Sequence, residues 1–120
     1  MIDNKLIHDW TVSYLSRRLS REYDDVRVNL DGDKKSEFNG HYPDLILRNH
    51  GFVMAVIEVE TEDSVTTEKA GEWKSLSGLG AKLILMVPNS MKSKALDILW
   101  KAGIADRASV GTYGISVNMP

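Results

Sequence analysis

The chain has 120 residues, of which 42% are hydrophobic and 27% are charged, as expected for one soluble globular domain. It contains no cysteine, which excludes disulfides, thiolate metal sites and a cysteine nucleophile. The formal net charge of -2 excludes a basic field over the whole molecule, so a contact with nucleic acid must use a local patch. No apolar run approaches the roughly 20 residues of a membrane helix, and the first ten residues lack the layout of a secretion signal. We therefore expect a cytoplasmic protein.

The first half of the chain predicts one helix and three strands. Apolar residues at helical spacing indicate the helix, which Asp3 or Asn4 can cap. A polar loop over residues 31–40 follows the first strand, and a turn at residues 49–51 joins the other two. The third strand is apolar on both faces, so we expect it at the centre of the sheet. The predicted elements are a helix over residues 3–22 and strands over residues 26–30, 42–48 and 52–60.

The second half predicts helices and strands in alternation. One helix directs Ala70, Trp73 and Leu76 inward, and Ser90 is expected to cap the other. The complete order is α-β-β-β-α-β-α-β, in which an antiparallel meander leads into a crossover unit. This order predicts an α/β fold with a mixed sheet and helices on both sides. The remaining elements are helices over residues 65–79 and 90–102 and strands over residues 82–87 and 110–117.

Acidic residues of the central hairpin are the strongest candidates for a functional site. Counting back from a three-residue turn at residues 49–51 places Asp44 opposite Val56. Strand alternation then puts Asp44, Glu58 and Glu60 on one face, with the first two about 7–8 Å apart as diagonal neighbours. Carboxylates so close repel unless a cation neutralises them, and oxygen ligands suit Mg²⁺. A two-residue turn would instead move Asp44 to the other face.

These residues carry a resemblance to a known family. Pro43-Asp44, a hydrophobic strand and Glu58-Val59-Glu60 resemble the motif of the PD-(D/E)XK nuclease superfamily, and the element order resembles its restriction-endonuclease-like core. The resemblance implies one such domain over residues 1–120 that acts on DNA phosphodiesters. In that family the Asp and the first Glu bind the divalent metal, which implies Asp44 and Glu58 as ligands of Mg²⁺ or Mn²⁺.

The third motif position departs from the family pattern, because Glu60 stands where a lysine usually positions or activates the attacking water. Some restriction enzymes of the superfamily carry Glu there as a further metal ligand or base. In other members the lysine has moved to the following helix, where this chain has Lys69. Lys69 lies about 40° around that helix from Trp73, so it borders the inward face. The expected catalytic residues are Asp44, Glu58, Glu60 and Lys69, with the three acids as metal ligands.

The same departure leaves the class of protein open. A metal-dependent nuclease is the leading hypothesis, and a catalytically inactive module of the same fold that binds DNA or a protein partner is the alternative. An unrelated α/β interaction domain is the third reading. The residues expected to contact DNA phosphates are Arg17, Arg18, Arg21, Lys34 and Lys35. Small resolvase-like relatives work as dimers, so the resemblance also implies a homodimer.

Other conspicuous residues are interpreted as structural. The spacing of His8 and His41 matches no zinc signature, and Asp9 lies off the apolar stripe and is expected at the surface. The apolar stripe of the first helix comprises Leu6, Ile7, Trp10, Tyr14, Leu15 and Leu19. Three tryptophans fall at helical core spacing and are predicted to pack in the core rather than to stack on bases: Trp10, Trp73 and Trp100.

Overall fold

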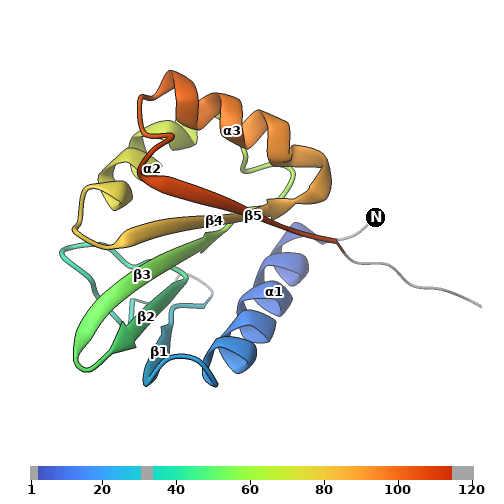
Figure 1. Ribbon diagram of the computed structural model, residues 1–120. Helices are drawn as coiled ribbons and strands as arrows, with labels where there is room; N and C mark the ends of the chain where they lie inside the picture. Colours follow the sequence, from blue (N-terminus) through green and yellow to red (C-terminus); the bar gives the residue numbers. More distant parts are fainter. Residues whose placement is uncertain (1–2, 31–33, 115–120) are drawn as a thin grey trace, which may run out of the picture.

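A computed structural model describes residues 3–30 and 34–114 of the chain. Figure 1 shows a five-stranded sheet with α1 on one face and α2 and α3 on the other. The helices are α1 (Asn4–Leu19), α2 (Ala70–Ser77) and α3 (Lys92–Lys101), with short 3-10 turns η1 (Thr67–Lys69) and η2 (Asn89–Met91) before the last two. The strands are β1 (Asp25–Val28), β2 (Leu45–Asn49), β3 (Phe52–Val59), β4 (Lys82–Pro88) and β5 (Ala108–Tyr113). Within these described ranges, no helix is long and apolar enough to cross a membrane.

The sheet is mixed and its strands follow chain order, β1-β2-β3-β4-β5. The first three strands pair antiparallel, whereas β4 is parallel to β3 and β5 is parallel to β4. Parallel neighbours require a crossover, and α2 and α3 supply the two crossovers on the same face of the sheet. The predicted mixed α/β class, the element order and the central position of β3 are therefore confirmed.

Several predicted element ends differ from the structure. The Asp3 cap is confirmed, since its carboxylate accepts the Lys5 backbone N–H at 2.9 Å. The Ser90 cap is wrong: Ser90 lies within η2, and its hydroxyl donates to Glu62 Oε1 at 3.5 Å. In the segment predicted as a helix over residues 65–79, helical structure begins only at η1, with Thr67. Residues 31–33 of the predicted loop and 115–117 of the predicted last strand lie outside the described residues.

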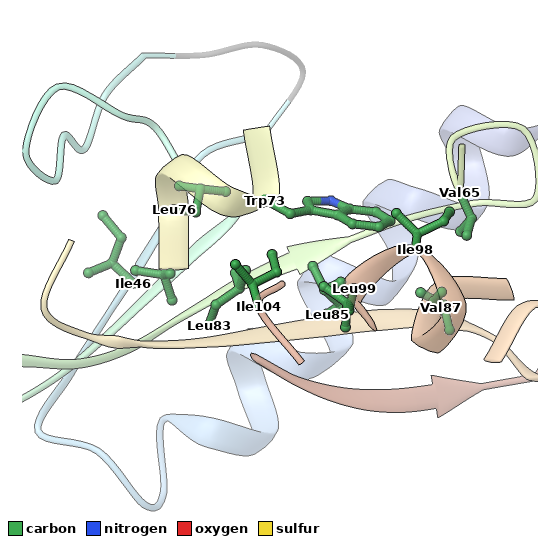
Figure 2. Close-up of a cluster of buried hydrophobic side chains, with 12 residues drawn as sticks. Ile46, Val65, Trp73, Leu76, Leu83, Leu85, Val87, Ile98, Leu99 and Ile104 are labelled. Atoms are coloured by element: carbon green, nitrogen blue, oxygen red, sulfur yellow. The ribbon is translucent and has the colours of Figure 1, made fainter. Parts of the chain in front are cut away.

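Two hydrophobic cores lie on the two faces of the sheet. The larger core lies between the sheet and the helices α2 and α3, where Trp73 is fully buried, as predicted (Figure 2). The smaller core lies under α1, where Val12 is fully buried against the other face. Trp10 and Trp100 are exposed, so their predicted core positions are wrong. The first helix has two apolar stripes, and the sheet covers the one with Val12, about 200° around the helix from Trp10.

The hairpin of β2 and β3 has a different turn from the one predicted. Asn49 pairs with Phe52 across a two-residue turn in which His50 and Gly51 both have positive φ, 53° and 81°. A register shift between Leu47 and Arg48 then adds one residue to β3. Beyond the shift, the register is Leu45 with Ile57, Ile46 with Val56 and Leu47 with Ala55.

This register corrects the predicted partner of Asp44. Extending it by one residue places Asp44 opposite Glu58, not opposite Val56. The shorter turn and the bulge each change the pairing by one residue, so together they keep Asp44 on the face of Glu58 and Glu60. The three acids thus belong to one side of the sheet despite the wrong turn length.

Candidate metal and active site

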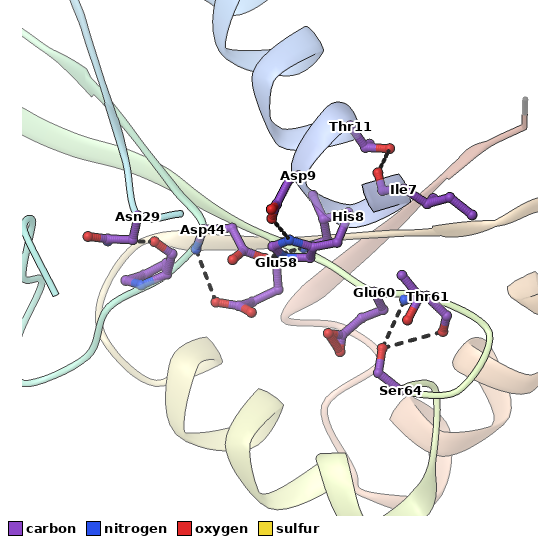
Figure 3. A network of polar contacts seen from close by, with 12 residues as sticks. Ile7, His8, Asp9, Thr11, Asn29, Asp44, Glu58, Glu60, Thr61 and Ser64 are labelled. Atoms are coloured by element: carbon purple, nitrogen blue, oxygen red, sulfur yellow. Dashed lines mark hydrogen bonds and ion pairs between the residues drawn. The ribbon is translucent and has the colours of Figure 1, made fainter. Parts of the chain in front are cut away.

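A pocket of about 320 Å³ opens where β2 begins and β3 ends. The first two turns of α1 form one wall through Asn4, Lys5 and His8, and the loop after β3 forms another. The pocket contains the side chains of all four residues expected to be catalytic: Asp44, Glu58, Glu60 and Lys69. Figure 3 shows the three acids gathered between α1 and α2, where the apolar strand β3 gives way to charged residues.

The side chains of Asp44 and Glu58 connect β2 to β3 beyond the last backbone pair, Leu45 with Ile57. Glu58 Oε1 accepts the Asp44 backbone N–H at 3.3 Å, and Asp44 Oδ2 accepts the Val59 backbone N–H at 2.8 Å. These two bonds replace the main-chain bonds that a longer β2 would make. Both residues line the pocket, directly across the hairpin from one another.

Glu58 is a buried acid whose negative charge Lys69 offsets only in part. Burial is the main cause that raises its pKa well above the usual value, and the negative charge of Asp44 adds to the shift. Glu72 and Glu60 act in the same direction, whereas Lys69 opposes them only in part. Burial and the neighbouring acids therefore favour the protonated form of Glu58.

Glu60 is also buried, but its two oxygens have partners. Oε2 accepts the indole N–H of Trp73 at 3.2 Å, and Oε1 lies 3.5 Å from the ammonium group of Lys69. Burial raises the pKa of Glu60 to about 7, with Lys69 and Trp73 opposing the shift. The Tyr113 hydroxyl anchors the same residue by donating to its backbone carbonyl at 2.6 Å. Glu60 can thus exchange a proton close to neutral pH.

Lys69 reaches the pocket from the end of η1, just before α2. Its Nζ contacts Glu72 Oε2 at 3.1 Å as well as Glu60. Burial disfavours the charged amine, but Glu60 and Glu72 outweigh that effect and the net pKa of Lys69 is raised. Lys69 therefore remains an ammonium ion, which can attract an anion or orient water but cannot accept a proton.

His8 is a pocket residue that the sequence reasoning set aside. Its Nε2 lies 3.0 Å from Asp44 Oδ2, and its Nδ1 lies 2.9 Å from Asp9 Oδ1 (Figure 3). The hydrogen bond to Asp44 is the main cause that raises the pKa of His8 to about 9, against the effect of burial. Asp9, expected at the surface, helps to hold the ring. One signal was present: His8 precedes Val12 by one helical turn and so shares the face that packs on the sheet.

The donor chemistry of the pocket fits a hard divalent cation, because the available ligands are carboxylate oxygens. As the side chains stand, no three His, Asp or Glu residues in the described part of the chain form a group that could hold a metal ion. Magnesium, however, is commonly bound by one or two carboxylates together with water and substrate phosphate. Asp44 and Glu58 supply such a pair, and burial, together with the negative charge of Asp44, raises the pKa of Glu58.

The basic residues expected to contact DNA lie outside the pocket lining. Arg17 and Arg18 end α1, and Arg21 follows it. Arg17 is nine residues beyond His8, or about 14 Å along the helix. Lys34 Nζ lies 5.5 Å from the centre of the Tyr42 ring, in the loop before β2. These residues would therefore contact DNA outside the pocket and do not form part of its lining.

Comparison of the chain with protein-family models, with curated proteins and with solved structures finds no match. The chemistry of the pocket must therefore be inferred from its own geometry and charge.

Proposed function

We propose that this chain is a small divalent-metal-dependent nuclease domain of restriction-endonuclease-like fold, acting on DNA phosphodiesters. The observation that carries the proposal is the placement of Asp44 and Glu58 directly across the hairpin, in one pocket with Glu60 and Lys69. The α-β-β-β-α-β order, with three antiparallel strands and a parallel fourth, supports the restriction-endonuclease-like assignment. The resemblance of Pro43-Asp44 and Glu58-Val59-Glu60 to the motif of the PD-(D/E)XK nuclease superfamily is the further support.

Asp44 and Glu58 are the residues that would hold Mg²⁺ or Mn²⁺. The cation, when bound, lowers the pKa of water and stabilises charge that develops on a phosphate. Its binding competes with protonation of Glu58, which burial and Asp44 favour.

Glu60 and Lys69 divide the remaining roles according to their protonation. Glu60, with a pKa of about 7, can accept a proton from an attacking water at neutral pH. Lys69 stays charged, so its role is to hold Glu60 in place and to attract the scissile phosphate. Its ammonium group supplies the positive charge of the usual motif lysine, although Lys69 reaches the pocket from η1 and not from the end of β3.

The proposal includes DNA as partner and a homodimer as the working unit. A chain with a net charge of -2 has little general attraction for DNA, and a second copy would double the local basic contacts. Arg17, Arg18 and Arg21 are the residues of α1 proposed to make phosphate contacts.

A second candidate function is an inactive module of the same fold that binds DNA or a protein. One observation favours it: both Glu60 oxygens are engaged by Trp73 and Lys69, which compensates this acid without a metal. In such a module the acids would serve only to join β2 to β3.

A cleavage assay separates the two candidates. Duplex, single-stranded and branched DNA would be incubated with the protein and Mg²⁺ or Mn²⁺, beside the variants Asp44→Asn, Glu58→Gln and Lys69→Ala. In a nuclease, the first two variants abolish cleavage, and Lys69→Ala slows it without weakening metal binding. Lys74→Ala is the matched control, because Lys74 is exposed on the adjoining helix α2 and does not line the pocket.

The result that contradicts catalysis is equally specific. If the wild type cleaves none of these substrates and its melting temperature ignores both metals, the chain is the inactive module.

A further inference from the structure

The exposed face of α1 carries a strip of aromatic and apolar side chains. Leu6, Trp10 and Tyr14 are 65%, 51% and 42% exposed. They follow one another at intervals of four residues, and the rings of Trp10 and Tyr14 stack with centroids 5.5 Å apart and an angle of 16° between their planes. A flat pair of rings therefore faces solvent on a helix whose opposite side packs against the sheet.

The same face continues into positive charge. Arg17 lies on the arc of Leu6, Trp10 and Tyr14 at about 100° per residue, with Arg18 beside it and Arg21 just beyond the helix. None of these arginines forms an ion pair with another described residue.

Within the described helix α1 this arc carries no acid, and the nearest acid along it is the N-cap Asp3 at the end opposite the arginines. The single acid within α1, Asp9, points elsewhere and is bonded to His8. We name the surface formed by Leu6, Trp10, Tyr14, Arg17, Arg18 and Arg21 the α1 outer face.

We propose that the α1 outer face binds an unpaired strand of DNA, with Trp10 and Tyr14 stacking on bases and the arginines contacting phosphates. Exposed aromatic rings beside unpaired cations are the combination that binds single strands, because every base offers a stacking face and every nucleotide a phosphate. A duplex hides its base faces, so it could use only the arginines. The inference rests on the proposed action on DNA and specifies its substrate class as DNA with an unpaired segment.

The position of α1 connects this surface to the pocket. His8 points inward to Asp44, whereas Leu6 and Trp10, two residues to either side of it, point outward. The first turn of α1 also contributes Asn4 to the pocket wall. A strand lying on the α1 outer face would thus pass the helix end that borders the acids.

The test is a binding measurement with the full chain in EDTA, so that binding is separated from cleavage. The probes are a short labelled single-stranded oligodeoxythymidylate and a duplex of the same length. We expect the single strand to bind more tightly, and Trp10→Ala and Tyr14→Ala each to weaken its binding about fivefold or more. Trp10→Phe keeps a ring and should retain most of the affinity. Replacing the three arginines with Gln should weaken binding and reduce its dependence on salt.

Trp100→Ala is the matched control. Trp100 is 76% exposed on α3, where the adjacent Lys101 is paired with Asp97 at 3.0 Å, so it is an exposed tryptophan outside the proposed surface. Its loss should leave binding unchanged. Far-UV circular dichroism of each variant checks that the fold is retained.

Four outcomes would overturn the inference. The first two are unchanged affinity of Trp10→Ala for the single strand, and a loss of affinity in Trp100→Ala equal to that in Trp10→Ala. The third is binding of the protein to phosphatidylserine vesicles but not to the oligonucleotide. The fourth is conversion of a dimer to a monomer by Trp10→Ala with no change in DNA binding. Binding that persists in a protein unable to cleave DNA would contradict only the proposed nuclease. Cleavage that persists without Trp10-dependent binding would contradict only the α1 outer face.

Discussion

His8 and Asp44 join the first helix to the start of β2 through an ion pair of 3.0 Å between Nε2 and Oδ2. Because Asp44 also accepts the Val59 backbone N–H, one carboxylate ties α1, β2 and β3 together. The pair is half-buried, so its attraction is screened less than that of a surface pair.

We therefore expect His8→Ala to lower the free energy of unfolding by about 1 kcal/mol at pH 7, measured by urea denaturation. His50→Ala is the control. His50 is exposed and its ring lies 3.7 Å from Asp24, so its loss should change stability by less than about 0.5 kcal/mol. Equal stability of the two variants would show that the contact of His8 with Asp44 contributes nothing.

The metal-free protein should lose stability as the pH rises from about 5 to 9. Glu60 has a pKa of about 7 in the folded state and 4.5 ordinarily, so the folded state binds more protons between these values. This acid alone should cost about 2–3 kcal/mol as the pH rises through that window. His8, with a pKa raised from 6.5 to about 9, contributes stability that is complete below 6.5 and is lost up to 9.

Urea denaturation in EDTA at several pH values measures this slope. Glu60→Gln should flatten the part between about pH 4.5 and 7, and His8→Ala the part between about 6.5 and 9. Stability that instead rises with pH across this range would contradict the assigned shifts.

Divalent metal should stabilise the protein through Asp44 and Glu58. At a Mg²⁺ concentration ten times the Kd, the gain should be about 1.4 kcal/mol, seen as a higher melting temperature. Asp44→Asn and Glu58→Gln should both abolish this gain. Glu22→Gln, at an exposed position away from the pocket, should keep it.

The two acid variants should differ when metal is absent. Glu58→Gln removes a buried, repelled carboxylate and should leave stability at pH 7 equal or higher. Asp44→Asn weakens the contact with His8 and should lower it. The same metal response in the wild type and Glu58→Gln would exclude Glu58 as a ligand.

Two glycines test how backbone conformation sets stability, Gly51 in the hairpin turn and Gly71 in α2. Gly51 has φ of +81°, and a Cβ there would meet no atom within 4 Å, so Gly51→Ala should destabilise through backbone strain alone, by about 1–2 kcal/mol. Gly71 in α2 is equally open but helical, and Gly71→Ala should stabilise by about 0.5–1 kcal/mol. Thermal melting of both variants measures these opposite signs. A loss at both positions would contradict the assigned helical role of Gly71.

Local patterns in the sequence were sufficient for the element order and the central strand. A strand that is apolar on both faces must be covered on both, and this predicted the place of β3 between two cores. The sequence also singled out Asp44, Glu58 and Glu60, since acids at the end of a buried strand are unusual without a partner. Lys69 came only from the family resemblance. That these residues form a metal site remains a prediction.

Only the tertiary structure decided the register, the contact of His8 and the outward face of α1. The alternation of side chains along a strand does not reveal a two-residue turn that is compensated by a bulge. The shorter turn and the bulge each change the pairing of β2 with β3 by one residue, so that together they keep Asp44 on the same face of the sheet. His8 meets Asp44 only after α1 packs on the sheet, across 36 residues of chain. Of the two apolar stripes on α1, the sheet covers the one with Val12 and leaves Trp10 in solvent. Helical spacing is a property of one segment, whereas the buried face depends on where a distant segment lies.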